Sequence, residues 1–291
     1  MFTERYKINN IIQRNNTYES FYCTLRNSNT FTRSLEIFSK NVTTKKDYFE
    51  LALLLSHNNI GKVHDFFFIG DKIYVISEIV AGQNILDRVV RLSSYSEKNS
   101  VKFIKIILGA IKYLSQRGIF MINVDLKCIN FTNKKDSSLK LSIYTQRDSG
   151  FFGHLSQTLG SYCAPEILLN QEVHLRTNLW TLGIFLSFLL TGREPFHDPR
   201  GKILTYRHIL ECDLKIEHCE KITDAGIDLL GRLLVKSPKD RISYNQIDNH
   251  PWFTIGRKGK PKLTHVRNSF KEMLRLDETK FNSKSTVQKN N

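Results

Sequence analysis

The chain contains no glycine before Gly61, although glycine occurs 15 times in its 291 residues. Glycine lets a backbone lie close to nucleotide phosphates, because it has no side chain and adopts conformations closed to other residues. The first sixty residues therefore lack the material for a glycine-rich loop that covers phosphates.

Long apolar runs are also missing. No stretch approaches the roughly 18 residues that a membrane-spanning helix needs. The nearest, Thr181–Thr191, is short and is better interpreted as a buried core helix. The N-terminus has no apolar centre of the kind found in secretory signal peptides. These absences favour an intracellular protein of the cytoplasm, the nucleus or both, with no membrane partner.

The five cysteines give no disulfide framework, since their number is odd and no Cys-x-x-Cys pair occurs. Cys212, His218 and Cys219 come closest to the spacing of metal ligands. We interpret them as ordinary residues of a reduced intracellular protein, and we expect no metal site there.

Positive charge is in excess and unevenly distributed. The formal net charge is +15, and residues 254–291 contribute +7 of it, from ten Lys/Arg against three Asp/Glu. This segment has little apolar periodicity outside a short helical patch near Asn268–Leu276, so we expect a mostly disordered tail. The basic cluster Arg257–Lys262 indicates a nuclear-import signal or a contact with an acidic partner, and a solvated surface is the alternative.

Apolar periodicity divides the rest of the chain into two regions. The first contains runs typical of strands and one helix, and helical patterns dominate after Gly82. The expected strands are 6–13, 19–26, 31–39, 62–68 and 72–80, with a helix over 48–56. The expected later helices are 96–117, 177–190, 224–235 and 244–248.

Short motifs in the second region are more specific. They are Val124–Asn130 (VDLKCIN), Ala164-Pro165-Glu166, Leu179–Gly183 (LWTLG), Arg241 and His250–Phe253 (HPWF). In this order and at these spacings they resemble the C-lobe of a eukaryotic Ser/Thr protein kinase, in particular the calmodulin-dependent and checkpoint group. The resemblance implies an α+β, bilobal domain over 1–253: a β-rich N-lobe to about residue 79, a hinge at 80–83, and a helical C-lobe over about 84–253.

Three catalytic-loop positions of that family are retained. The resemblance places Asp125 at the catalytic base, Lys127 two residues later, and Asn130 at the second metal-ligand position. Asn123-Val124 replaces the usual His-Arg, so the arginine that reads activation-loop phosphate is absent. We expect these retained residues to be idle in catalysis and to brace the loop.

The resemblance also predicts two structural contacts in the C-lobe. Glu166 and Arg241 should form the ion pair that anchors the activation segment. Asn178 stands where the family has aspartate, and it should accept a hydrogen bond from the catalytic-loop backbone without carrying charge.

The phosphate-covering loop departs from the family pattern. Gln13, Asn15 and Glu19 stand where the resemblance implies glycines, and Glu19 would direct negative charge at nucleotide phosphates. Phe21 takes the place of the valine that covers adenine, and its ring should intrude on the base pocket.

Two further departures remove charged groups that handle ATP. Glu36 stands where the third strand should supply the phosphate-pairing lysine, and Ile143 stands where Asp-Phe-Gly should supply a magnesium ligand. Lys40 is about 13 Å along the strand and too far away to replace the lysine. The helix carboxylate that would pair with that lysine is not assigned either, because counting back places Tyr48 there, between Asp47 and Glu50.

The joint loss of loop, cation and metal ligand predicts a pseudokinase. It would regulate or scaffold signalling by binding a protein partner, such as an active kinase or its substrate, with no cofactor. The first alternative is an atypical Ser/Thr kinase with weak transfer from ATP and Mg²⁺ through Asp125. The second is a nucleic-acid or chromatin-associated protein acting through its basic tail. The chain lacks an aromatic-rich basic stripe for stacking bases, so nucleic acid is the least favoured partner.

Overall fold

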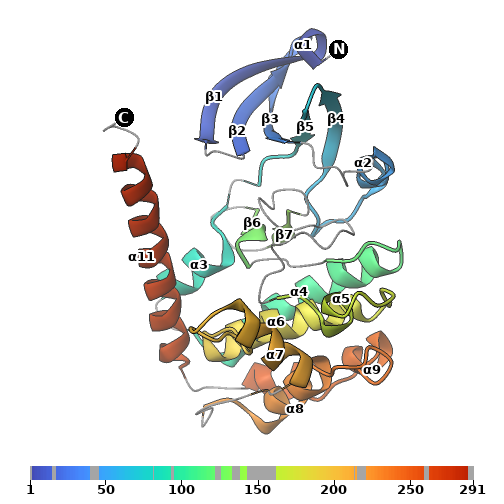
Figure 1. The fold of residues 1–291 in the computed structure, drawn as a ribbon, viewed down its shortest axis with the longest axis vertical. Helices are drawn as coiled ribbons and strands as arrows, with labels where there is room; N and C mark the ends of the chain where they lie inside the picture. The colour runs from blue at the N-terminus through green and yellow to red at the C-terminus, as the bar shows by residue number, and fades with distance from the viewer. Residues whose placement is uncertain are drawn as a thin grey trace.

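The protein is described by a computed structural model. It describes residues 2–14, 18–39, 46–80, 82–92, 95–121, 126–132, 138–142, 162–212, 214, 221–258 and 262–287. Two lobes are stacked along the long axis, with the β-rich lobe at the top of Figure 1 and the helical lobe below. The predicted α+β, bilobal fold is confirmed.

The N-lobe is built on a five-stranded antiparallel sheet in the order β1-β2-β3-β5-β4. Its strands are β1 (Tyr6–Arg14), β2 (Tyr18–Leu25), β3 (Ser28–Ser39), β4 (Val63–Ile69) and β5 (Lys72–Ser77). The short helix α1 (Phe2–Arg5) precedes β1, and α2 (Lys46–Leu54) packs beside β4. All five predicted strands and the predicted helix occur close to their expected positions.

Side chains on the two faces of this sheet belong to different apolar clusters, because alternate residues of a strand point to opposite faces. On the outer face, Leu35 and Ile37 of β3 pack with Phe2 and Tyr6 of the N-terminal segment. On the inner face, Val75 of β5 packs with residues of α2. The inner face is the one that can contribute to a cleft between the lobes.

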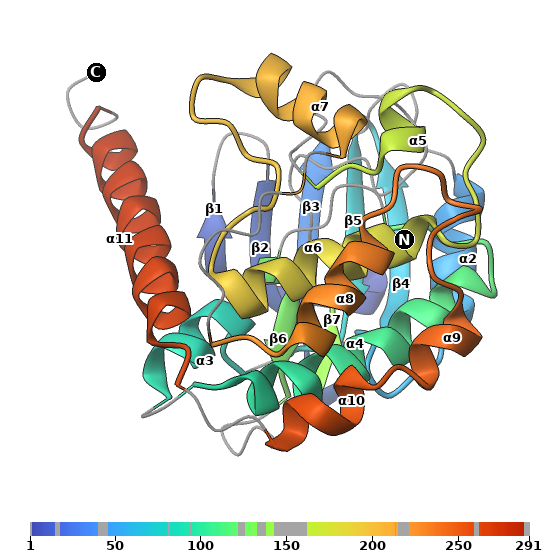
Figure 2. The same cartoon turned by 90° about the horizontal axis from the view of Figure 1, so that it is seen from below.

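The C-lobe is mainly helical. Its elements are α3 (Ile85–Arg91), α4 (Glu97–Ser115), η1 (Leu126–Cys128), β6 (Ile129–Phe131), β7 (Leu139–Leu141), α5 (Pro165–Leu168), α6 (Thr177–Thr191), α7 (Lys202–Glu211), α8 (Asp224–Leu233), α9 (Tyr244–Asp248), α10 (Trp252–Ile255) and η2 (Gly256–Lys258). Helix α6 is apolar on all sides and buried from Thr177 to Leu190, as a central core helix should be. It packs against α4 and α8, and Figure 2 shows α8 beside it.

The C-terminal segment differs from the prediction. Instead of a mostly disordered tail, Thr264–Val287 forms the 24-residue helix α11, which rises along one side of the molecule (Figure 1). Its first turns bury Val266 and Phe270 against the C-lobe. The close approach to α6 depends on Gly192, where an added Cβ would lie 3.0 Å from the Cα of Val266. Burial of these two apolar side chains stabilises the helix by packing it against the C-lobe. The charged composition of the segment gives no sign of this packing.

Within the described residues, no helix combines the length and the apolar character needed to cross a membrane.

Candidate functional site

The inner face of β3 carries a buried carboxylate. Glu36 is 3% exposed and lies between Ser20 of β2 and Val75 of β5 in the strand register. Since Val75 packs toward α2, Glu36 occupies the same inner face. The structure therefore places an acidic group where the sequence comparison with kinases expects the phosphate-pairing lysine.

The register of β2 corrects two predictions about the nucleotide pocket. Phe21 lies opposite Leu35, and it packs in the outer cluster with Phe2 and Tyr6. Glu19 lies opposite Ile37, another residue of that cluster. Residues directly opposite each other on paired strands share a face, so both side chains point to the outer face. The prediction failed because a shift of one residue in register exchanges the two faces of a strand. Phe21 does not enter the base pocket, and Glu19 does not face the phosphates.

The hinge is closely packed against the C-lobe. A Cβ added to Gly82 would lie 1.8 Å from the carbonyl oxygen of Phe131, so only glycine fits there. The Phe131 backbone N–H donates to the carbonyl of Gln83 at 2.9 Å. An ion pair between Lys140 of β7 and Glu78, directly after β5, joins the lobes beside this contact.

The predicted ion pair between Glu166 and Arg241 is confirmed. The two guanidinium nitrogens Nη1 and Nη2 of Arg241 lie 3.0 Å from Oε1 and Oε2 of Glu166, and the side chains are 0% and 1% exposed. Arg241 also donates to the carbonyls of Val235 and Arg176. These hydrogen bonds and the ion pair give the guanidinium group partners inside the protein, so the charged side chain can remain buried in the core.

Asn178 accepts a backbone hydrogen bond, as predicted, but the donor precedes the catalytic loop instead of belonging to it. Its Oδ1 accepts from the backbone N–H of Met121 at 2.6 Å, and its Nδ2 donates to Ser115 Oγ and to the carbonyl of Ile119. Thr181 completes the arrangement by donating to the carbonyl of Met121 at 2.9 Å. Helix α6 therefore fixes the backbone directly before the catalytic loop.

The structure describes only part of the catalytic loop. Asp125, Ile143 and Asn15 lie outside the described residues, as do the side chains of Lys127 and Gln13. Asn130 is half-buried on β6, opposite Lys140 of β7 and joined by a backbone bridge to Asn84, the N-cap of α3. The helix carboxylate left open above remains unassigned, because Asp47 and Tyr48 have no described side chains and Glu50 is exposed on α2.

Comparison with known proteins decides the family. Residues 34–253 match the protein kinase domain family. The chain belongs to the protein kinase family. It is 33% identical over 231 residues to human calcium/calmodulin-dependent protein kinase type IV, covering 76% of this chain and 48% of that protein.

Other relatives of this kinase domain are also kinases by name. A probable myosin light chain kinase of Dictyostelium discoideum is 29% identical over 256 residues, covering 84% of this chain and 61% of that protein. A serine/threonine-protein kinase H1 homologue of Pinctada fucata is 26% identical over 245 residues, covering 80% and 58%. The chain thus spans about half to three fifths of the length of these relatives.

One described residue of this kinase domain does not fit the Mg²⁺·ATP that the family uses. Glu36 puts a carboxylate on the inner face where a cation would neutralise phosphate charge. We therefore derive no phosphoryl-transfer step from this site.

Sequence reasoning missed a second buried carboxylate, which holds the C-lobe together. Glu97, in the first turn of α4, accepts from Trp252 Nε1 at 2.6 Å and from Thr223 Oγ1 at 2.8 Å. An added Cβ at Gly226 would lie 2.6 Å from Glu97 Oε1. The only sequence signal is a glutamate in the first turn of a helix, which is usually an exposed residue that interacts with the helix dipole.

A third carboxylate orders the loop before α7. Asp198 is buried, and Arg200 binds it through Nε at 3.0 Å and Nη2 at 2.7 Å. His208 Nε2 lies 3.1 Å from its Oδ2. Hydrogen bonds from Arg200 hold the pKa of the Asp198 carboxyl well below its usual range.

Proposed function

We propose that this chain is a pseudokinase that regulates or scaffolds signalling by binding a protein partner. The observation that carries the proposal is the buried carboxylate of Glu36 on the inner face of the N-lobe sheet. It stands at the position where the family uses a lysine to hold ATP phosphates. The sequence adds Ile143, which has no oxygen to bind magnesium.

The change of charge at position 36 should have a large effect on the free energy of nucleotide binding. Two unit charges 4 Å apart interact by about 4 kcal/mol at an effective dielectric constant near 20. A carboxylate in place of an ammonium group replaces that attraction with repulsion. A loss of about 4 kcal/mol alone weakens binding roughly a thousandfold, so the site should bind nucleotide far more weakly than a site with lysine at this position.

The alternative function is weak Ser/Thr phosphorylation through Asp125. It is favoured by the retention of Asp125 and Asn130, and by the kinase names of the relatives. The two functions differ in what Asp125→Ala does. A pseudokinase shows no magnesium-dependent transfer from ATP before or after the change, whereas an atypical kinase shows transfer that the change abolishes.

Calorimetric titration of the purified chain with millimolar Mg²⁺·ATP tests the proposal directly. We expect no saturable binding by the natural protein and measurable binding by Glu36→Lys. The matched control is Glu211→Lys, which makes the same charge change at an exposed position on α7 and should leave binding undetectable. Tight, magnesium-dependent binding by the natural protein would contradict the proposal.

Because Glu36 is buried, its replacement can disturb folding. Circular dichroism and melting curves of Glu36→Lys are therefore recorded with the titration. Glu36→Gln, which is neutral and close in size, gives a second measurement. It removes the repulsion without adding attraction, so its affinity for Mg²⁺·ATP should lie between those of the natural protein and of Glu36→Lys.

A further inference from the structure

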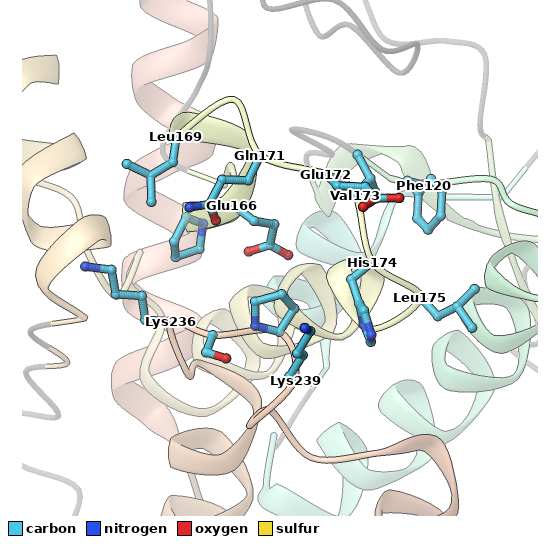
Figure 3. A pocket seen from close by; sticks show the side chains of 13 residues that line it. Phe120, Glu166, Leu169, Gln171, Glu172, Val173, His174, Leu175, Lys236 and Lys239 are labelled. Atoms are coloured by element: carbon cyan, nitrogen blue, oxygen red, sulfur yellow. The ribbon is translucent and has the colours of Figure 1, made fainter.

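The C-lobe contains a pocket of about 760 Å³ outside the cleft between the lobes. Figure 3 shows it between α5, the loop that joins α5 to α6, and the loop that joins α8 to α9. Apolar side chains, including Phe120, Pro165 and Val173, line it together with two lysines. The pocket is separate from the nucleotide site of the kinase family, so nucleotide binding does not explain it.

Hydrogen bonds hold together the two loops that form the walls of the pocket. An arginine from each loop donates to backbone carbonyls of the other loop. Arg176, at the end of the first loop, donates through Nη1 to the carbonyls of Lys239 and Arg241 at 2.6 and 2.7 Å. Arg241 donates back to the carbonyl of Arg176 at 2.8 Å and fixes Glu166 of α5. A pocket fixed in this way loses little conformational entropy when a ligand binds.

Two large apolar side chains of the pocket are left in water. Leu169 is 43% exposed and Leu175 is 56% exposed, and both belong to the pocket lining. Exposed apolar groups that gather at a concave site indicate a surface that a partner covers. Covering them with a large apolar side chain would contribute favourable binding energy in proportion to the area removed from water.

The charges beside these leucines favour an acidic partner. Lys236 and Lys239 line one wall and are exposed (Figure 3), and neither ammonium group has a carboxylate partner within the part of the chain that the structure describes. Of the two carboxylates in the lining, Glu166 is neutralised by Arg241, which leaves Glu172 as the exposed one. The lysines therefore present positive potential to a ligand.

We infer that this pocket is a docking site for an extended segment of a protein partner, with one large apolar side chain beside carboxylates. The apolar residue would cover Leu169 and Leu175, and its acidic neighbours would pair with Lys236 and Lys239. The inference rests on the proposed function in one respect, since it gives that binding protein a place to hold its partner. A small anion would use the lysines but leave both leucines exposed.

A set of short synthetic peptides tests this inference by fluorescence polarisation with the full chain. Each peptide carries one Phe, Leu or Trp flanked by Asp or Glu at varied spacing. Matched peptides have Ser for the apolar residue or Lys for the acidic ones. We expect saturable binding of some acidic apolar peptides and none of either matched set, because the pocket requires both the apolar and the acidic contact.

Two double variants locate the binding. Lys236→Glu with Lys239→Glu should weaken it about tenfold or more. The matched control, Lys98→Glu with Lys105→Glu, makes the same charge change at exposed positions of α4 outside the pocket, and it should change affinity by less than about twofold. Leu169→Asp provides an independent loss through the apolar contact.

The inference is overturned if no peptide of the set binds, or if both double variants weaken binding equally, which would indicate a general charge effect. Concentration-dependent dimerisation that Leu169→Asp abolishes would identify a second copy of the chain as the occupant and would also overturn it. Failure here leaves the Mg²⁺·ATP titration unaffected. Conversely, tight nucleotide binding would contradict the pseudokinase proposal while leaving a peptide-binding pocket in place.

Discussion

Replacement of Arg241 by alanine should destabilise the whole C-lobe. The Arg241 side chain is 0% exposed and makes paired bonds at 3.0 Å to Glu166, which is 1% exposed. It also donates to the carbonyls of Val235 and Arg176. Arg241→Ala leaves the Glu166 carboxylate buried without its counter-charge and frees these carbonyls.

The expected cost follows from this burial. Removal of one member of a buried ion pair typically costs about 3–5 kcal/mol, because the remaining charge stays in a poorly solvating interior. For a domain of this size, each kcal/mol lowers the melting temperature by about 2–4 °C. The variant should therefore melt roughly 6–20 °C below the natural protein, as measured by circular dichroism or scanning calorimetry.

Two further variants separate the ion pair from a general loss of charge. Arg232→Ala removes an equally charged residue from an exposed i,i+4 pair with Asp228 and should cost less than about 1 kcal/mol. The double variant Glu166→Gln with Arg241→Met removes both charges, so it should be more stable than Arg241→Ala. A melting temperature of Arg241→Ala equal to that of Arg232→Ala would refute the reasoning.

Three other predictions concern the hinge glycine, the buried carboxylate of Asp198, and Glu36 on the inner face of the N-lobe sheet. Gly82→Ala should lower the melting temperature by several degrees and shift hinge amide signals in NMR spectra, because its Cβ would clash with the Phe131 carbonyl. Asp198→Asn should reduce the loss of folding stability on acidification. The lowered folded-state pKa of Asp198 gives stability above pH about 4 that is lost as pH falls. Chemical denaturation at several pH values measures this, and an unchanged pH dependence in the variant would contradict it. Glu36→Lys with Ile143→Asp should gain Mg²⁺-dependent ATP binding in calorimetry beyond either single change, with little phosphoryl transfer because the loop still lacks glycine.

Several features of this protein could be predicted from the sequence alone. The family, the bilobal fold, the Glu166–Arg241 pair and the role of Asn178 as a hydrogen-bond acceptor all follow from motifs at fixed spacings. Such motifs are informative because each residue has one chemical task, such as a fork of donors for a carboxylate, that few other residues can perform. The substitution at Glu36 was visible for the same reason, since it changes the sign of a charge.

Other features were decided only by the tertiary structure. The register of β2 turned Phe21 to the outer face, because a count along a loop cannot detect a shift of one residue between paired strands. Helix α11 is anchored by Val266 and Phe270, whose burial depends on distant α3 and α6. The docking pocket requires loops about sixty residues apart to meet through Arg176 and Arg241. Contacts between distant segments have no periodic or local signature in a single sequence, so folding in three dimensions alone brings them together.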